Sequence, residues 1–274
     1  MLQWRMRGYV TPEDFEGSDA QRIQQALDAS HALDIGRVVL TGEYTVDKTL
    51  RIYGMTDLVL ENALLIAGGD FPALINSNYF EEESRHCWSF EEKYITIRGK
   101  NSKILGDVLL YNVHHANIWD LEFGGALKFG FAREVRLYRC RFSGKNAVVL
   151  GQGANNFIIQ DIDANCADTA VVMDGTLMLS SYAVGKEPEI HSVILQESRL
   201  EAPVAVSMYA DRVGRIYNTQ VDHLSVSNIP LALGKEGETA PEECYFNLTA
   251  EALTSDAGEK MAVFNPTKHC YFPG

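Results

Sequence analysis

A pattern of hydrophobic positions eight residues long recurs along most of the chain. Apolar side chains occupy its first, third, sixth and eighth positions, apart from one serine and one threonine in the later copies. The copies cover residues 58–65, 116–123, 135–142, 157–164, 193–200 and 219–226. A weaker last copy places Phe246, Leu248, Glu251 and Leu253 at the four positions. Such spacing, with room for insertions between copies, is typical of a solenoid protein.

The spacing inside each copy predicts two short strands joined by a bend. Alternation places the first and third positions on one face of a strand, and the extra residue before the sixth position turns the chain so that the sixth and eighth also face inward. Another apolar run, such as "VLLYNV" or "AVVLG", precedes each copy. Three strands per turn of about 20 residues, without helices between them, predict a parallel β-helix. An antiparallel sandwich is the alternative.

One helix is predicted, near the N-terminus. Ser18 and Gln21 form a capping box, and Ile23, Ala26 and Leu27 follow as one apolar stripe. This helix would cover the open end of the first coil, whose strand edge would otherwise invite aggregation. We therefore expect a single β-helix domain over residues 1–274, with the cap helix at about 19–32, the coils at about 38–254 and a C-terminal extension at 255–274.

Charge narrows the classes of partner. The chain carries 37 acidic and 24 basic residues, a formal net charge of −13. This excess opposes binding to nucleic acid or to an anionic membrane. The N-terminus has no apolar segment followed by a small-residue cleavage site, so we expect a cytoplasmic protein.

Neither a metal nor a cofactor is expected. The five cysteines are scattered and form no CxxC motif, which indicates neither a disulfide framework nor a zinc site. His114 and His115 are consecutive, so on a regular strand they would face opposite ways and could not bind one ion together.

Two segments resemble the pectin-lyase-like superfamily. "GSDAQRIQQALDASHALDIGRVVLTGEYTV" is similar to its N-terminal cap helix and first strand, and "YITIRGKNSKILGD" is similar to a segment of the family 28 glycoside hydrolases, the polygalacturonases. The resemblance covers most of the chain. It implies an all-β, single-stranded right-handed parallel β-helix with a short N-terminal cap helix, and a polygalacturonase-like activity on an oligo- or polysaccharide.

The catalytic motifs of that family are largely missing. Its NTD segment falls on "GKNAVVL", where Asn146 replaces the aspartate, and its GDD segment falls on "CADTAVVMDG", where Asp168 alone remains. The GHG segment falls near "LSSYAVG", which has no histidine, and the RIK segment falls on the uncharged "VAVSM".

A hydrolase of this kind needs a second carboxyl group. Inverting glycosidases place two carboxyls roughly 6.5–9.5 Å apart, one protonated and one ionised. Asp174, Asp163 and Asp211 are the candidates to pair with Asp168. We take Asp168, Asp174 and Asp211 as the candidate catalytic residues. The candidate substrate-binding residues are Asn146, Arg212, Arg215, Tyr182 and Tyr209, where the arginines could bind a sugar carboxylate.

Each assignment has a structural alternative. Asp168 and Asp174 flank the apolar run "TAVVM" as turn residues would, and Asn146 could belong to an asparagine ladder between coils. Two functions therefore stay open at this point. One is a glycoside hydrolase, and the other is a non-catalytic β-helix that binds a glycan or another protein.

Overall fold

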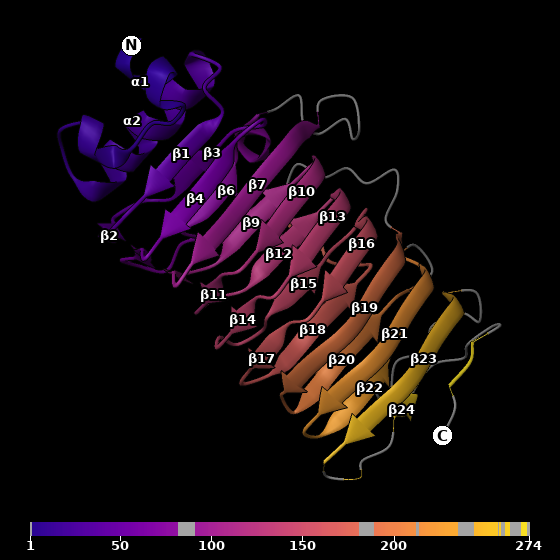
Figure 1. Cartoon of the computed structure of the whole chain (residues 1–274). Helices are drawn as coiled ribbons and strands as arrows, with labels where there is room; N and C mark the ends of the chain where they lie inside the picture. The colour runs from indigo at the N-terminus through magenta and orange to yellow at the C-terminus, as the bar shows by residue number, and fades with distance from the viewer. Residues whose placement is uncertain are drawn as a thin grey trace.

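The coils of this computed structural model stack along one axis, and each contributes short strands to parallel sheets (Figure 1). The structure describes residues 2–81, 91–180, 189–211, 214–234, 244–256, 258, 261–263 and 270–272. Neighbouring strands of both sheets pair in parallel. The predicted right-handed parallel β-helix is therefore confirmed, and the antiparallel sandwich is excluded.

Two columns of strands merge into one 15-stranded sheet. The first column consists of β1 (Arg37–Leu40), β4 (Asp57–Glu61), β7 (Glu92–Lys100), β10 (Val113–Trp119), β13 (Arg133–Tyr138), β16 (Asn155–Gln160), β19 (Ile190–Glu201), β21 (Ile216–Val226) and β23 (Tyr245–Ser255). The second column consists of β2 (Glu43–Val46), β5 (Leu64–Ala67), β8 (Lys103–Leu105), β11 (Glu122–Phe123), β14 (Arg141–Phe142) and β17 (Asp163–Asn165). The columns merge because the long strand β19 pairs with both β16 and β17.

The third column is a separate nine-stranded sheet that closes the coils. It consists of β3 (Leu50–Ile52), β6 (Leu74–Asn76), β9 (Val108–Tyr111), β12 (Leu127–Gly130), β15 (Val148–Leu150), β18 (Thr169–Asp174), β20 (Val204–Tyr209), β22 (Ile229–Leu233) and β24 (Ala262–Val263). Strand β24 lies in the stretch expected to be a C-terminal extension, so the coils continue past residue 254.

A left-handed backbone conformation bends each repeat at the position that the pattern predicts. The φ angle is +58° at Asp120, +48° at Arg139, +54° at Asp161, +52° at Glu197 and +49° at His223. Each of these residues directly precedes the sixth position of its copy. The bend allows both arms of the repeat to face the interior, and all four pattern positions are buried in the six strong copies.

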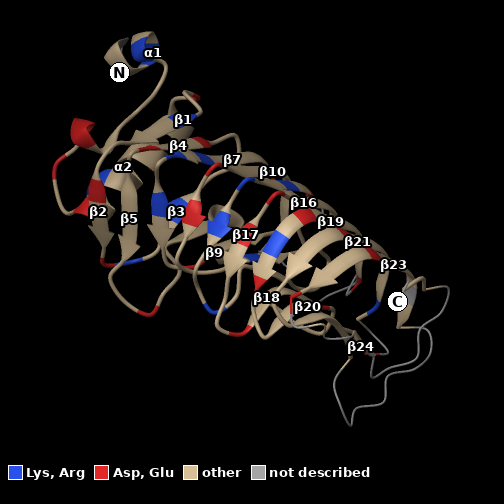
Figure 2. Ribbon diagram, turned by 60° about the horizontal axis from the view of Figure 1, so that its bottom comes forward, with Lys and Arg blue, Asp and Glu red and all other residues tan. Residues whose placement is uncertain are grey.

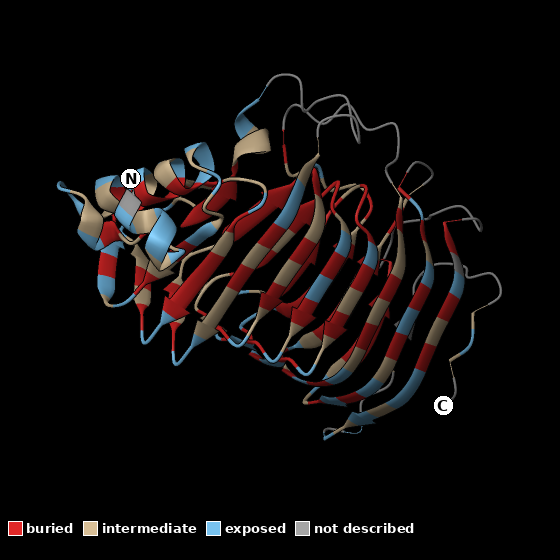
Figure 3. Ribbon diagram, turned by 45° about the horizontal axis from the view of Figure 1, so that its top comes forward, coloured by how far each residue is buried: buried red, intermediate tan, exposed pale blue. Residues whose placement is uncertain are grey.

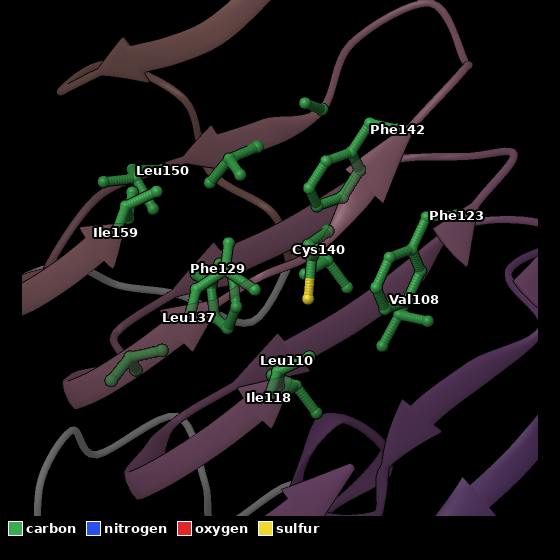
Figure 4. Close-up of a cluster of buried hydrophobic side chains, with 14 of the residues drawn as sticks. Val108, Leu110, Ile118, Phe123, Phe129, Leu137, Cys140, Phe142, Leu150 and Ile159 are labelled. Atoms are coloured by element: carbon green, nitrogen blue, oxygen red, sulfur yellow. The ribbon is translucent and has the colours of Figure 1, made fainter. Parts of the chain in front are cut away.

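The interior consists of side chains stacked from coil to coil. Leu137 lies in register between Ile118 and Ile159, and all three are at most 1% exposed. The rings of Phe123 and Phe142 stack with their centroids 5.2 Å apart. Figure 4 shows these residues pointing into one interior together with side chains of the third column. Figure 3 shows the resulting bands of buried and exposed residues along the first-column strands.

The last predicted copy is out of register by two residues. Strand β23 aligns Leu248 with Thr219, Ala250 with Val221 and Leu253 with Leu224. Glu251, expected at the sixth position, is exposed and lies before the bend residue Ala252. The physical reason is that an unpaired carboxylate is too costly to bury, so Leu253 takes the sixth position in place of Glu251.

Helix α2 (Asp19–Ala32) covers the first coil over the predicted range 19–32. The Gln21 N–H donates to the Ser18 Oγ at 3.4 Å, and the Gln21 Oε1 accepts from the Ser18 N–H at 2.9 Å. The stripe of Ile23, Ala26 and Leu27 is fully buried. Two short helices, α1 (Leu2–Arg7) and η1 (Pro12–Asp14), precede it, and η2 (Ser77–Phe80) follows β6. Among the described residues, no helix has the length and apolar character needed to cross a membrane.

The substitution Ile159→Asp should unfold the protein, because it places an unpaired carboxylate in the fully buried stack between Leu137 and Leu195. We expect a loss of more than about 4 kcal/mol of stability, measured as a collapse of the thermal transition in circular dichroism. Ile158→Asp is the matched control, because Ile158 lines the outer face. Equal melting temperatures for the two variants would contradict this register.

Candidate functional site

Asp168 and Asp174 lie at opposite ends of one strand. Asp168 comes directly before β18, and Asp174 is its last residue. A strand rises roughly 3.3 Å per residue, so about 20 Å separates the two positions. Asp174 is therefore not the second carboxyl that pairs with Asp168, because the strand between them is extended.

Both carboxylates have local partners. The Lys145 Nζ lies 3.7 Å from the Asp168 Oδ2, and the Asp168 side chain is 56% exposed. The Asp174 Oδ1 accepts hydrogen bonds from the Thr176 N–H at 2.9 Å and the Thr176 Oγ1 at 2.6 Å. The first contact is a surface ion pair, and the second closes the turn after β18.

The other two candidates do not approach Asp168 along the strands either. Tyr209 lies beside Asp174 in the next coil, and Asp211 follows it at the same end of the sheet. The Asp211 Oδ1 accepts a 2.7 Å hydrogen bond from the backbone N–H three residues further on. Asp163 belongs to β17 of the second column. Asp168 is thus separate from Asp163 and from the far end of the sheet, where Asp174 and Asp211 both lie.

The predicted substrate-binding residues are dispersed in the same way. The Asn146 Nδ2 donates to the backbone oxygen of Thr169 at 2.6 Å, which ties one coil to the next. The Arg215 Nε lies 3.4 Å from the Glu189 Oε1. Arg212 and Tyr182 lie outside the described residues.

A groove of about 810 Å³ lies elsewhere, on the outer face of the first column. It crosses the strands from β7 to β23. Its lining includes the amide side chains of Asn117, Asn156, Asn218, Gln220 and Asn247. Two charged side chains, Glu134 and Arg136, also line it.

A second column of left-handed residues shapes this groove. The residues have φ between +50° and +61° and lie at equivalent places in seven coils, directly before the residue in register with the first pattern position; they are Tyr94, His115, Glu134, Asn156, Ser192, Asn218 and Asn247. All seven line the groove. Sequence reasoning missed this column. The available signal was the asparagine at this place in three coils, because Asn tolerates positive φ better than most residues.

The bend at His115 also overturns the expectation for the two histidines. Because φ is +61° at His115, the strand does not alternate there. The rings of His114 and His115 stack with centroids 4.0 Å apart and planes 19° apart. The two imidazoles therefore lie on the same side of the strand.

Glu134 from the next coil faces both imidazoles. Its Oε1 lies 3.1 Å from the His114 Nε2, and its Oε2 lies 3.0 Å from the His115 Nδ1. The imidazole of His114, with that of His115 beside it, lowers the pKa of Glu134.

A buried carboxylate supports the same cluster from behind. The Glu91 side chain is 6% exposed, and its Oε1 lies 3.4 Å from the His114 Nδ1. The Arg133 Nε donates to the Glu91 Oε2 at 2.8 Å, and a second guanidinium nitrogen contacts the other oxygen. A bidentate guanidinium contact of this kind holds a carboxylate in a fixed orientation.

Aromatic side chains extend the outer face. Tyr94 is 52% exposed, and its ring stacks on His115 with centroids 4.9 Å apart and planes 4° apart. Trp119 follows Asn117 by two residues on β10, so both occupy the same face. Trp119 lines a second hollow of about 850 Å³. That hollow is rich in ion pairs, such as the Arg139 Nε with the Asp120 Oδ1 at 2.7 Å.

No family model matches the sequence, and no curated protein matches it. Solved structures match it through the fold. PfbA, a surface adhesin of Streptococcus pneumoniae, is 12% identical with a TM-score of 0.56, covering 96% of this chain and 93% of that one. A mutant tailspike protein of E. coli bacteriophage HK620, in complex with a hexasaccharide, is 11% identical with a TM-score of 0.67.

The tailspike match covers 98% of this chain but 57% of the tailspike chain. Another mutant of that tailspike, in complex with a pentasaccharide, matches at 10% identity and a TM-score of 0.57, covering 98% of this chain and 66% of that one. At such identities the likeness establishes a shared parallel β-helix fold and no activity. The resemblance to family 28 hydrolases stays a prediction.

Asn156→Val should destabilise the protein by roughly 1–2 kcal/mol, because a β-branched residue is strained at a φ of +55°. Asn156→Gly removes the same side chain without this strain and serves as the control. Urea denaturation of both variants measures the difference. If valine proved no worse than glycine, the left-handed column would be misassigned.

Proposed function

We propose that this protein binds a neutral oligosaccharide in the groove on the outer face of the first column. The observation that carries the proposal is the exposed ring of Tyr94, held flat against His115 at one end of a groove lined with amides. An exposed aromatic face provides a large rigid contact surface for the apolar face of a sugar ring. Amide side chains both donate and accept hydrogen bonds, as sugar hydroxyl groups do.

Charge supports a neutral ligand over an acidic one. The chain has a formal net charge of −13, and the ribbon in Figure 2 shows acidic and basic residues interspersed along the coils. Within the groove, the positive charge of Arg136 is accompanied by the negative charge of Glu134. A polyanion would therefore be repelled at long range without finding a basic surface in the groove.

The geometry also suits a chain-like ligand. The groove crosses seven first-column strands, from Tyr94 on β7 to Thr249 on β23. Adjacent strands lie about 4.8 Å apart, so these coils span roughly 29 Å, enough for several sugar units. The complexes of the tailspike with a hexasaccharide and a pentasaccharide support the same ligand class for this fold.

The resemblance to family 28 hydrolases suggests the more specific hypothesis of glycoside hydrolysis. The geometry supports hydrolysis less well than it supports binding alone. Asp168 pairs with Lys145 at the surface, and Asp174 closes a turn at the far end of β18. Neither arrangement provides a proton donor facing a water-activating carboxylate. Binding without hydrolysis is thus the function that the site supports best.

Tyr94→Ala should weaken glycan binding about fivefold or more, because truncating an aromatic side chain that anchors a ligand typically costs more than about 1 kcal/mol. An array of neutral and acidic glycans identifies the ligand, and titration calorimetry then gives the dissociation constant. Tyr53→Ala is the matched control, since Tyr53 stacks on His31 in the cap region. An array on which no neutral glycan binds, or equal affinities for the two variants, would refute the proposal.

The hydrolysis hypothesis has its own assay. We expect the purified protein to release no reducing ends from polygalacturonate, rhamnogalacturonan or neutral aryl glycosides, because the required pair of carboxylates is not assembled around Asp168. Asp168→Asn is tested beside it. Turnover by the wild-type protein that the substitution abolishes would establish a hydrolase and reinstate Asp168 as catalytic.

A further inference from the structure

We propose that His114, His115 and Glu134 form a binding site for a divalent transition-metal ion, with zinc as the test ion. Among the described residues, these three offer ligand atoms that all lie within 4.8 Å of one another. Two imidazole nitrogens and one carboxylate are a donor set that zinc uses at open sites. The site goes beyond glycan binding and does not depend on it.

The distances between the ligand atoms suit a small ion. The Glu134 oxygens lie 3.1 Å from the His114 Nε2 and 3.0 Å from the His115 Nδ1. Zinc holds nitrogen and oxygen ligands at about 2.0–2.2 Å, which places adjacent ligand atoms of a tetrahedron roughly 3.3 Å apart. Each nitrogen–oxygen distance thus needs to lengthen only slightly to reach the spacing of ligands around zinc.

An unsatisfied histidine points to the same conclusion. Both ring nitrogens of His114 are buried, and neither contact with the flanking carboxylates has the alignment of a hydrogen bond. Buried polar atoms without a hydrogen bond are rare and costly. An ion between the His114 Nε2 and Glu134 would give this Nε2 atom a partner.

The residues behind the cluster resemble the support that metal sites require. A metal-binding histidine commonly has a carboxylate beside its second nitrogen, which selects the tautomer and orients the ring. Glu91 lies on this side of the ring, where its Oε1 approaches the His114 Nδ1 to 3.4 Å without an aligned hydrogen bond, and Arg133 holds Glu91. Nε2 is then the nitrogen left to face the ion.

The stacked rings add a conformational consequence. The lone pair of an imidazole nitrogen lies in the plane of its ring, and the planes of these two stacked rings are nearly parallel and separate, so a single ion requires one ring to turn. His115 is the more exposed of the two, with 34% of its side chain accessible against 16% for His114. Turning His115 would disturb its stacking on Tyr94, which couples the ion to the end of the groove. Three protein ligands also leave a position for water or for a hydroxyl group.

The test is a titration of the untagged, EDTA-dialysed protein with zinc, monitored by competition with a chromophoric chelator. We expect one ion per chain for the wild type, and at least tenfold weaker binding for His115→Asn and Glu134→Gln. Asparagine tolerates the positive φ at position 115, so His115→Asn keeps the backbone conformation. Circular dichroism confirms that each variant is folded.

His191→Ala is the matched control, because His191 also stacks on a tyrosine in the same column. It should bind zinc like the wild type. Cobalt provides a second readout, since its visible spectrum should report a four- or five-coordinate site in the wild type and in His191→Ala, and not in His115→Asn or Glu134→Gln. No stoichiometric zinc in the wild type, or equal affinity in Glu134→Gln and the wild type, would overturn the proposal. Glycan affinity measured without metal tests the proposed function separately.

Discussion

The stacking of equivalent residues in successive coils is the constraint on which the rest of this structure depends. Neighbouring strands lie one hydrogen-bond spacing apart, so a coil that changed its path would lose its bonds to two neighbours. A bend introduced in one coil must therefore recur in the next. This explains why left-handed residues form columns, with Asp120, Arg139 and Asp161 in one and Glu134 and Asn156 in another.

The two columns have different consequences. The bend before the sixth pattern position keeps both arms of the repeat directed at the core, and the buried stack from Ile118 to Leu195 results from it. The bend before the first position acts on the outer face. It removes the alternation of the strand, so that Tyr94, His115 and Glu134 come together across three coils and line one groove. The left-handed backbone conformation that recurs because the coils stack thus also positions the side chains of the candidate site.

The aspartates selected by the resemblance to family 28 hydrolases do not line this groove. Asp168 is an exposed partner of Lys145, and Asp174 stabilises a turn, because β18 holds them at its two ends. Motif matching transfers residue types from one scaffold to another without transferring their placement. On a β-helix the outer face can change freely while the stacked interior is preserved, so the fold by itself does not specify the chemistry.

The sequence by itself determined the repeat, the cap helix at 19–32 and the inward positions of six coils, because burial of apolar residues leaves a periodic signal. Its one error of register, at Glu251, arose where the apolar pattern fades. Only the tertiary structure decided the site. His114 and His115 share a side because of one backbone angle, and Glu134 reaches them from the next coil. Contacts between coils join residues about 20 positions apart, and no local pattern along the chain encodes which outward side chains meet.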